Sequence, residues 1–143
     1  MKRRVLVMSG GVVLMVMTGL LQAAEMRLDA REKAGMSGVL RDGMRVMTGR
    51  IVCRESHTGF YVWMLNRQVE ARPGHYIVQG RRDSRHEMRV RLEGDGWSPG
   101  GAEGQPGMVN TGPEEQAVFD VVADGGQHVA PDEYIFTVTG KCL

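Results

Sequence analysis

The sequence predicts an all-β protein, an antiparallel sandwich that is one strand short. Runs of alternating apolar and polar residues recur along the chain, and turn residues separate them. No segment has the periodicity of a convincing amphipathic helix. Short, turn-bounded strands of this kind are typical of two packed sheets.

The last stretch of the sequence is the strongest strand candidate. Tyr134, Phe136 and Val138 form one face of it, in alternation with Ile135 and Thr137. Such a core strand is expected to have neighbours on both sides, because an open row of N–H and C=O groups is a template for pairing with another chain. No sequence follows that could supply the second neighbour. We therefore expect the missing strand to come from another molecule.

Residues 1–24 have the features of a secretory signal peptide, which leaves one domain at residues 25–143. The basic start Lys2-Arg3-Arg4 precedes an apolar stretch from Val5 to Leu21 and a small-residue exit at Ala23-Ala24. An uncleaved membrane anchor is the alternative, because the apolar stretch is near the lower length limit for a spanning helix. Charged residues follow at once, which favours cleavage.

Removal of the signal peptide changes the charge balance. The full chain has 18 basic and 17 acidic residues, and three of the basic residues lie in residues 1–24. The exported part therefore has a net charge of about −2 with neutral histidines. This balance argues against nucleic acid as a partner, because such binding needs a basic surface.

The two cysteines, Cys53 and Cys142, both lie in the exported part. An even number in an oxidising compartment favours one disulfide, which would join the terminal strand to an early one. In the chain-entropy model, closing a loop of this length contributes roughly 4 to 5 kcal/mol. We expect no metal site and no cofactor, because the cysteines are far apart and the four histidines show no ligand spacing.

Glu25–Ala30 is predicted to be a short edge strand with Met26 and Leu28 on one face. A donor strand offered to a neighbouring subunit is the alternative. A donor needs a longer alternating run ahead of the first strand of its own domain, and only the signal peptide precedes this segment. We therefore favour an ordinary first strand.

Two further strands are expected in the first half. Arg45–Arg54 places Met47 and Cys53 on the face that we assign to the core. Phe60–Leu65 is apolar on both faces and is therefore predicted to be central. Its Trp63 follows a strand that carries a cysteine, an order found in immunoglobulin domains, where a tryptophan packs against the disulfide.

The second half contains strands at Tyr76–Val78, 88–93 and Gln116–Val122. The middle one alternates apolar residues with Arg89 and Arg91, which we expect to face solvent. Gly94–Pro113 has seven glycines and three prolines and is predicted to be a long functional or mobile loop. Its Trp97 could present an aromatic anchor, although packing against the sandwich is favoured.

The candidate residues for contact with a host are Arg81, Arg82 and Arg85, together with Trp97. The arginines belong to a basic region, whereas residues 93–133 contain no lysine or arginine. A charged face that is simply solvated is the alternative. The sequence contains no nucleophile elbow, no zinc-protease motif and no phosphate-binding loop before a helix, so we predict that the protein is not an enzyme.

Several stretches resemble the D subunit of the Afa/Dr adhesins, the AfaD/DraD-type invasins. They are Arg41-Asp42-Gly43, Thr48-Gly49-Arg50-Ile51-Val52-Cys53-Arg54-Glu55, His57-Thr58-Gly59-Phe60, Val62-Trp63-Met64, Gly94-Asp95-Gly96-Trp97-Ser98-Pro99 and Ala130-Pro131-Asp132-Glu133-Tyr134. The resemblance covers essentially the whole exported chain.

The resemblance implies an incomplete immunoglobulin-like sandwich that is exported by the chaperone–usher route. Its groove would be filled first by a periplasmic chaperone and then, at the outer-membrane usher, by the donor strand of an adhesin subunit. The subunit would sit at the fimbrial tip on the cell surface, or be secreted, and would promote entry into host cells with β1 integrins as receptor class. The resemblance also implies the pairing of Cys53 with Cys142.

The groove is expected to be lined by Tyr134, Phe136 and Val138, with Met26 and Leu28 on the opposite lip. Strand addition of this kind gains affinity from backbone hydrogen bonds and specificity from pockets for alternate side chains. Two alternatives remain open. One is a self-complemented periplasmic or secreted binding module, and the other is a shaft subunit that donates residues 25–30.

Overall fold

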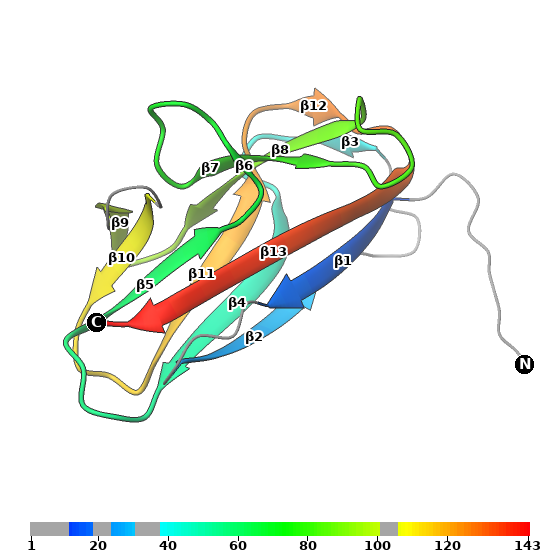
Figure 1. The fold of residues 1–143 in the computed structure, drawn as a ribbon. Coiled ribbons are helices and arrows are strands. Elements are labelled where there is room, and N and C mark those ends of the chain that lie inside the picture. The colour runs from blue at the N-terminus through cyan, green and yellow to red at the C-terminus, as the bar shows by residue number, and fades with distance from the viewer. Residues whose placement is uncertain (1–11, 19–23, 31–37, 101–105) are drawn as a thin grey trace, which may run out of the picture.

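The structure is a computed structural model that describes residues 12–18, 24–30, 38–100 and 106–143. The basic start of the predicted signal peptide, part of its exit, the charged link after Ala30 and residues 101–105 of the glycine-rich segment lie outside this range. Within it, the chain forms two packed β-sheets and one small strand pair (Figure 1). No helix that is long and apolar enough to cross a membrane occurs among the described residues.

The first sheet has five strands. In spatial order they are β1 (Val12–Thr18), β13 (Asp132–Cys142), β5 (Gly59–Met64), β10 (Gly107–Thr111) and β9 (Trp97–Gly100). β1 runs parallel to β13, and the other neighbours in this sheet are antiparallel. The strand predicted at the end of the sequence is therefore the second strand of this sheet, not its edge.

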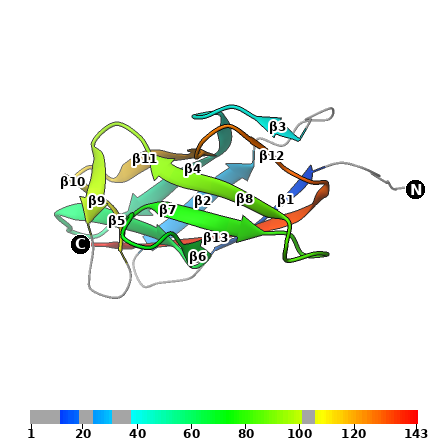
Figure 2. The ribbon, with the colours of Figure 1, turned by 90° about the horizontal axis from the view of Figure 1, so that it is seen from above.

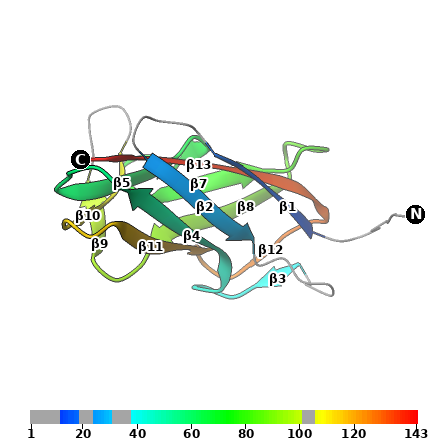
Figure 3. The same cartoon turned by 90° about the horizontal axis from the view of Figure 1, so that it is seen from below.

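The second sheet has six strands, all paired antiparallel. In spatial order they are β2 (Ala24–Ala30), β4 (Arg45–Cys53), β11 (Gln116–Ala123), β8 (Glu87–Glu93), β7 (His75–Gln79) and β6 (Arg67–Gln68). β3 (Val39–Leu40) and β12 (Gln127–His128) form the small pair. β2 and β4 run side by side in the views from above and from below (Figure 2, Figure 3).

The core lies between the two sheets and follows the predicted alternation. Met47, Ile51 and Cys53 of β4 are buried, as the sequence indicates. From the other sheet, Phe60, Val62 and Met64 of β5 and alternate residues of β13 fill the same space. The all-β sandwich is thus confirmed, and the faces assigned to β4 and β13 are correct.

Trp63 lies elsewhere than the immunoglobulin pattern suggests. Phe60 and Val62 of β5 belong to the core cluster that contains Cys53, whereas Trp63 does not. Trp63 instead stacks on Tyr61, with ring centroids 4.5 Å apart, on the other face of β5. The immunoglobulin arrangement of a tryptophan against the disulfide is therefore not present at Trp63, because side chains of consecutive strand residues point to opposite faces.

The predicted loop at Gly94–Pro113 contains β9 and β10, so that prediction was wrong in part. β10 pairs with both β5 and β9. Gly107 packs so tightly that a Cβ there would clash with the carbonyl oxygen of Val62 and the Cβ of Trp63. The glycine that suggested a loop is required here because two strand backbones approach closely.

Arg91 was expected to face solvent, but it is mostly covered. Its guanidinium donates to Asp42 at 2.8 Å, to Glu93 at 3.0 Å and to Asp124 at 3.1 Å. The bond to Asp42 is the largest of the contributions that raise the pKa of Arg91 above its usual range, against the opposing effect of burial. His75 completes the cluster, with its Nδ1 atom 2.8 Å from Asp124.

Candidate functional site

The exposed edge that the sequence predicts beside β13 is filled in the structure. β1 pairs along it in parallel, with Val12 opposite Asp132, Leu14 opposite Tyr134 and Val16 opposite Phe136. The expectation that the chain supplies no second neighbour is therefore corrected. The neighbour comes from within residues 1–24, the segment predicted to be a signal peptide (Figure 1).

β1 places alternate side chains between the two sheets. Val12 and Leu14 are 5% and 7% exposed and belong to the core, whereas Met15 is 37% exposed. Val12 and Leu14 are two residues apart, so both point to the same face of β1, the face toward the core. We call the space that they fill the strand slot. It lies beside β13, between that strand and β2.

The five residues predicted to line the groove lie around this slot. Tyr134, Phe136 and Val138 are completely buried and face the space between the sheets. Met26 and Leu28 of β2 are partly buried and pack against the same core cluster. At one end the walls meet, because a Cβ on Gly140 of β13 would lie 2.9 Å from the Cε of Met26.

A buried carboxylate fixes the start of β13. The Asp132 side chain is fully buried and accepts hydrogen bonds from the backbone N–H groups of Arg82, Asp83 and Glu133 at 3.0, 3.1 and 2.6 Å. The Nδ1 atom of His86 lies 2.9 Å from the same carboxylate. A Cβ at Gly80 would clash with it, so glycine is needed there.

The surroundings of Asp132 stabilise its charged form. Burial alone would raise the pKa of this carboxyl group, but the hydrogen bonds from Arg82, His86, Glu133 and Asp83 outweigh burial and lower it to about 2. Sequence reasoning identified Asp132 only as the start of a strand. Its partners are 46 to 50 positions away in the sequence, except for its neighbour Glu133, so no local pattern marks the role.

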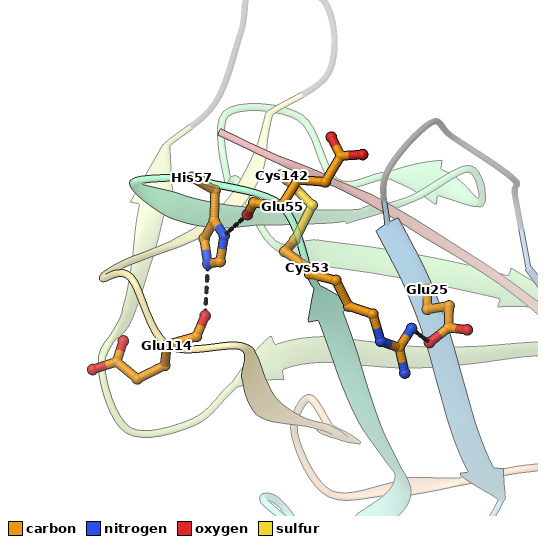
Figure 4. The surroundings of a disulfide bond; sticks show 7 residues. Glu25, Cys53, Glu55, His57, Glu114 and Cys142 are labelled. Atoms are coloured by element: carbon orange, nitrogen blue, oxygen red, sulfur yellow. Dashed lines mark hydrogen bonds and ion pairs between the residues drawn. A yellow bond between two sulfur atoms is a disulfide. The ribbon is translucent and has the colours of Figure 1, made fainter.

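The disulfide fixes the other end of β13. Cys53 and Cys142 are bonded, their Cα atoms are 5.9 Å apart, and they join the last residues of β4 and β13 across the two sheets (Figure 4). Beside them, both ring nitrogens of His57 lie 2.6 Å from backbone carbonyl oxygens, those of Glu55 and Glu114. β13 is thus held at both ends, which keeps the slot wall in place whatever strand lies against it.

The candidate host-contact residues lie in two separate segments of the fold. Arg81 and Arg85 lie in the turn between β7 and β8, where Arg81 pairs with Glu133 at 3.2 Å and Arg85 pairs with Asp83 at 2.9 Å. Arg82, in the same turn, is exposed. Trp97 follows the other end of β8. The seven residues of that strand separate it from the turn by roughly 20 Å, at about 3.3 Å per residue.

Trp97 packs against the sandwich. Its Nε1 donates to the carbonyl oxygen of Val118 at 2.8 Å, and its ring meets Phe119 edge-on with centroids 5.9 Å apart. This arrangement agrees with the packing role that was favoured over that of a fully presented anchor.

Comparison with known proteins places these features in a family. A model of the family described as Enterobacteria AfaD invasin protein matches residues 36–140. The chain belongs to the AfaD invasin family. It is 53% identical to Protein AfaD of Escherichia coli over 141 residues, covering 99% of this chain and 94% of that protein. It is also 50% identical to Protein AggB of Escherichia coli over 143 residues, covering 100% of this chain and 97% of the relative.

A solved structure that is similar to this chain has the same fold. The crystal structure of HdaB, the minor tip subunit of the Hda pilus of E. coli, superposes with a TM-score of 0.77 at 39% identity, covering 83% of this chain and 82% of that one. The protein is a chaperone–usher fimbrial tip subunit with an incomplete immunoglobulin-like fold, and not an enzyme. Its class is exported through the periplasm to the cell surface, and its partners are a chaperone, an usher and other subunits joined through a donor strand.

Proposed function

We propose that residues 1–24 are removed during export and that the strand slot then receives a strand from the neighbouring adhesin subunit. The observation that carries this proposal is the position of β1, which pairs along β13 and buries Val12 and Leu14 between the sheets. Loss of β1 would expose the edge of β13 and leave the core without these two side chains. An open edge of this kind is a template for a new strand.

The strand that replaces β1 should present apolar side chains at every second position. The slot wall is formed by Tyr134, Phe136 and Val138, and the Tyr134 hydroxyl already donates to the carbonyl oxygen of Ala130, so a charge on the inward face of the strand would be buried without a partner. Backbone pairing would supply most of the affinity, and the inward side chains would supply the register.

The position of β2 argues against a role as a shaft subunit. A shaft subunit would have to release residues 25–30 as a donor, but β2 is paired with β4 along its whole length and its Met26 and Leu28 pack on the core of the same domain. We therefore propose that the subunit accepts a strand and does not donate one, as a terminal subunit would.

The test uses residues 25–143 with the disulfide formed. We expect this chain alone to associate or to unfold at low temperature, and a synthetic peptide with the sequence of residues 12–18 to raise its melting temperature. At a peptide concentration one hundred times Kd, the added stability is about 2.7 kcal/mol. The matched control is the same peptide with Leu14→Asp. A chain that is monomeric, stable and indifferent to every peptide would instead be the self-complemented module.

We further propose that the tip subunit promotes entry of bacteria into host cells, with β1 integrins as the receptor class. The resemblance to AfaD/DraD-type invasins and the family description support this role. The candidate contacts lie in two places, with Arg81, Arg82 and Arg85 in the turn between β7 and β8 and Trp97 at the start of β9. Alanine variants of each set, assayed separately for cell entry with purified β1 integrin as competitor, distinguish the two positions.

In that assay, loss of entry with the arginine set but not with Trp97→Ala would place the contact at the turn between β7 and β8. Loss with Trp97→Ala alone would place it near β9. Full entry by both sets of variants would exclude these residues as the contact, and entry that purified integrin does not reduce would exclude the receptor class.

A further inference from the structure

The outer face of the six-stranded sheet carries two arginines directly opposite each other. Arg27 of β2 is paired in register with Arg50 of β4, and Arg50 is paired in register with Val118 of β11. Together with Thr48, Gly49 and Gln116, these residues line a cleft of about 300 Å³. We call it the arginine cleft.

Like charges at directly opposed positions of an antiparallel pair are destabilising, because the Cβ atoms are only about 5 Å apart. Two acids near the pair are bound to other arginines. Glu25 is bound by Arg54 at 2.6 Å (Figure 4), and Asp120 lies 3.5 Å from Arg45. Among the residues that the structure describes, neither Arg27 nor Arg50 forms an ion pair.

The neutral contacts of the cleft leave donors available. Arg50 donates one bond, from Nη1 to Oε1 of Gln116 at 3.3 Å. Thr48 donates to Asp120 at 3.3 Å, so this acid is also engaged next to the arginine row. Each guanidinium has five N–H groups, which leaves several free to bind an oxyanion.

An exposed apolar side chain adjoins the pair. Val118 is 54% exposed on a strand whose other face is buried, and it lies next to Arg50. Guanidinium groups beside an apolar surface suit a ligand that combines a carboxylate with an aliphatic stem, because a planar fork matches the carboxylate and the stem covers the apolar group.

We propose that the arginine cleft binds a glutamate-bearing, acidic peptide segment of a partner protein. Two guanidinium groups in one row attract adjacent carboxylates, and Val118 receives the methylene groups between them. The cleft is separate from the strand slot, because Arg27 points outward whereas Met26 and Leu28 of the same strand point toward the core. One face of β2 therefore borders the strand slot, and the other borders the arginine cleft.

Fluorescence anisotropy with a labelled hexaglutamate peptide and the full disulfide-bonded chain tests the proposal. Binding should be measurable at low ionic strength and should weaken as salt is added. Arg27→Gln and Arg50→Gln should each weaken it about tenfold or more, as expected for loss of a hydrogen-bonded charge pair. Arg89→Gln is the matched control, because Arg89 is an exposed arginine on β8, outside the cleft, and should change the affinity less than about twofold.

Arg27→Glu separates binding from folding. This change replaces a like-charged pair by an opposite one, so the melting temperature should stay at or above that of the parent chain while the affinity for hexaglutamate falls. The proposal is overturned if hexaglutamate does not bind, if Arg89→Gln weakens it as much as Arg50→Gln, or if hexaglutamine binds equally well. It is also overturned if only a sulfated heparin oligosaccharide binds, because the ligand would then be a glycan.

Discussion

The two edges of the five-stranded sheet are closed in different ways. At one edge, β9 has four residues, is next to its partner β10 in the sequence, and contains Pro99, which has no N–H to offer a further strand. At the other edge, β1 has seven residues and pairs with the sequence-distant β13. The first edge is closed by the domain itself, whereas closure of the second depends on a segment with the features of a signal peptide.

Loss of the disulfide should reduce the stability most. The bridge holds β13, which forms the wall of the strand slot, and it does not touch β9. Replacing Cys53 and Cys142 by alanine should lower the free energy of unfolding by about 4 kcal/mol. Urea denaturation of the full chain measures this loss. A decrease below about 1 kcal/mol would mean that Asp132 and strand pairing fix β13 without the bridge.

A carboxylate placed on β1 should lower the stability much more than a carboxylate placed on β9. Leu14→Asp in the full chain puts a carboxylate in the strand slot and should cost about 3 kcal/mol or more, unless β1 leaves the slot. Ser98→Asp on β9 is the matched change at an exposed position and should alter the stability by less than about 0.5 kcal/mol. Equal effects of the two variants would contradict the distinction between the edges.

The acid dependence of stability should sharpen the account of β13. Because the pKa of Asp132 is lowered to about 2, the stability that it contributes is present above about pH 4 and is lost as the pH falls toward 2. Asp132→Asn should be less stable at neutral pH and should show a shallower loss between pH 4 and 2. Asp83, with a pKa also lowered to about 2, keeps part of the slope in the variant. Thermal melts across this pH range give the comparison, and parallel acid profiles would show that Asp132 is not responsible.

The smallest effect is expected at the β9 edge. Trp97→Phe retains the aromatic contact with Phe119 but removes the bond to the carbonyl oxygen of Val118. The expected loss is about 1 kcal/mol, the usual net value of one hydrogen bond. When Trp97→Phe is introduced into residues 25–143, the affinity for the peptide of residues 12–18 should be unchanged. A change in peptide affinity would show that the two edges are coupled.

Local alternation was enough to predict the sandwich. The buried faces of β4 and β13 follow from apolar residues that repeat every second position, and the disulfide follows from two cysteines in an exported chain. The glycine content of residues 94–113 predicts a loop and misses β9 and β10, whereas in the structure a side chain at Gly107 would clash with the carbonyl oxygen of Val62. Glycine content alone does not distinguish a flexible segment from a tightly packed strand.

The contacts across the sheets could not be predicted from the sequence. β1 lies in an apolar stretch that satisfies the criteria for a signal peptide, and nothing in it indicates pairing with β13. Asp132 gains its role from a turn 46 to 50 positions earlier. The pairing of Arg27 with Arg50 depends on the register of two strands, and a shift of β2 by one residue would turn Arg27 to the core face.

Amide hydrogen exchange on β13 shows whether residues 1–24 or the domain itself closes the strand slot. The full chain, residues 25–143 alone, and residues 25–143 with the peptide of residues 12–18 are compared. We expect the amides of residues 133–138 that face β1 to be protected in the full chain, to exchange faster when residues 1–24 are absent, and to regain protection with the peptide. The amides of β10 that pair with β5 should change little. Equal protection of β13 in all three samples would show that the slot is closed by the domain itself and would contradict the account.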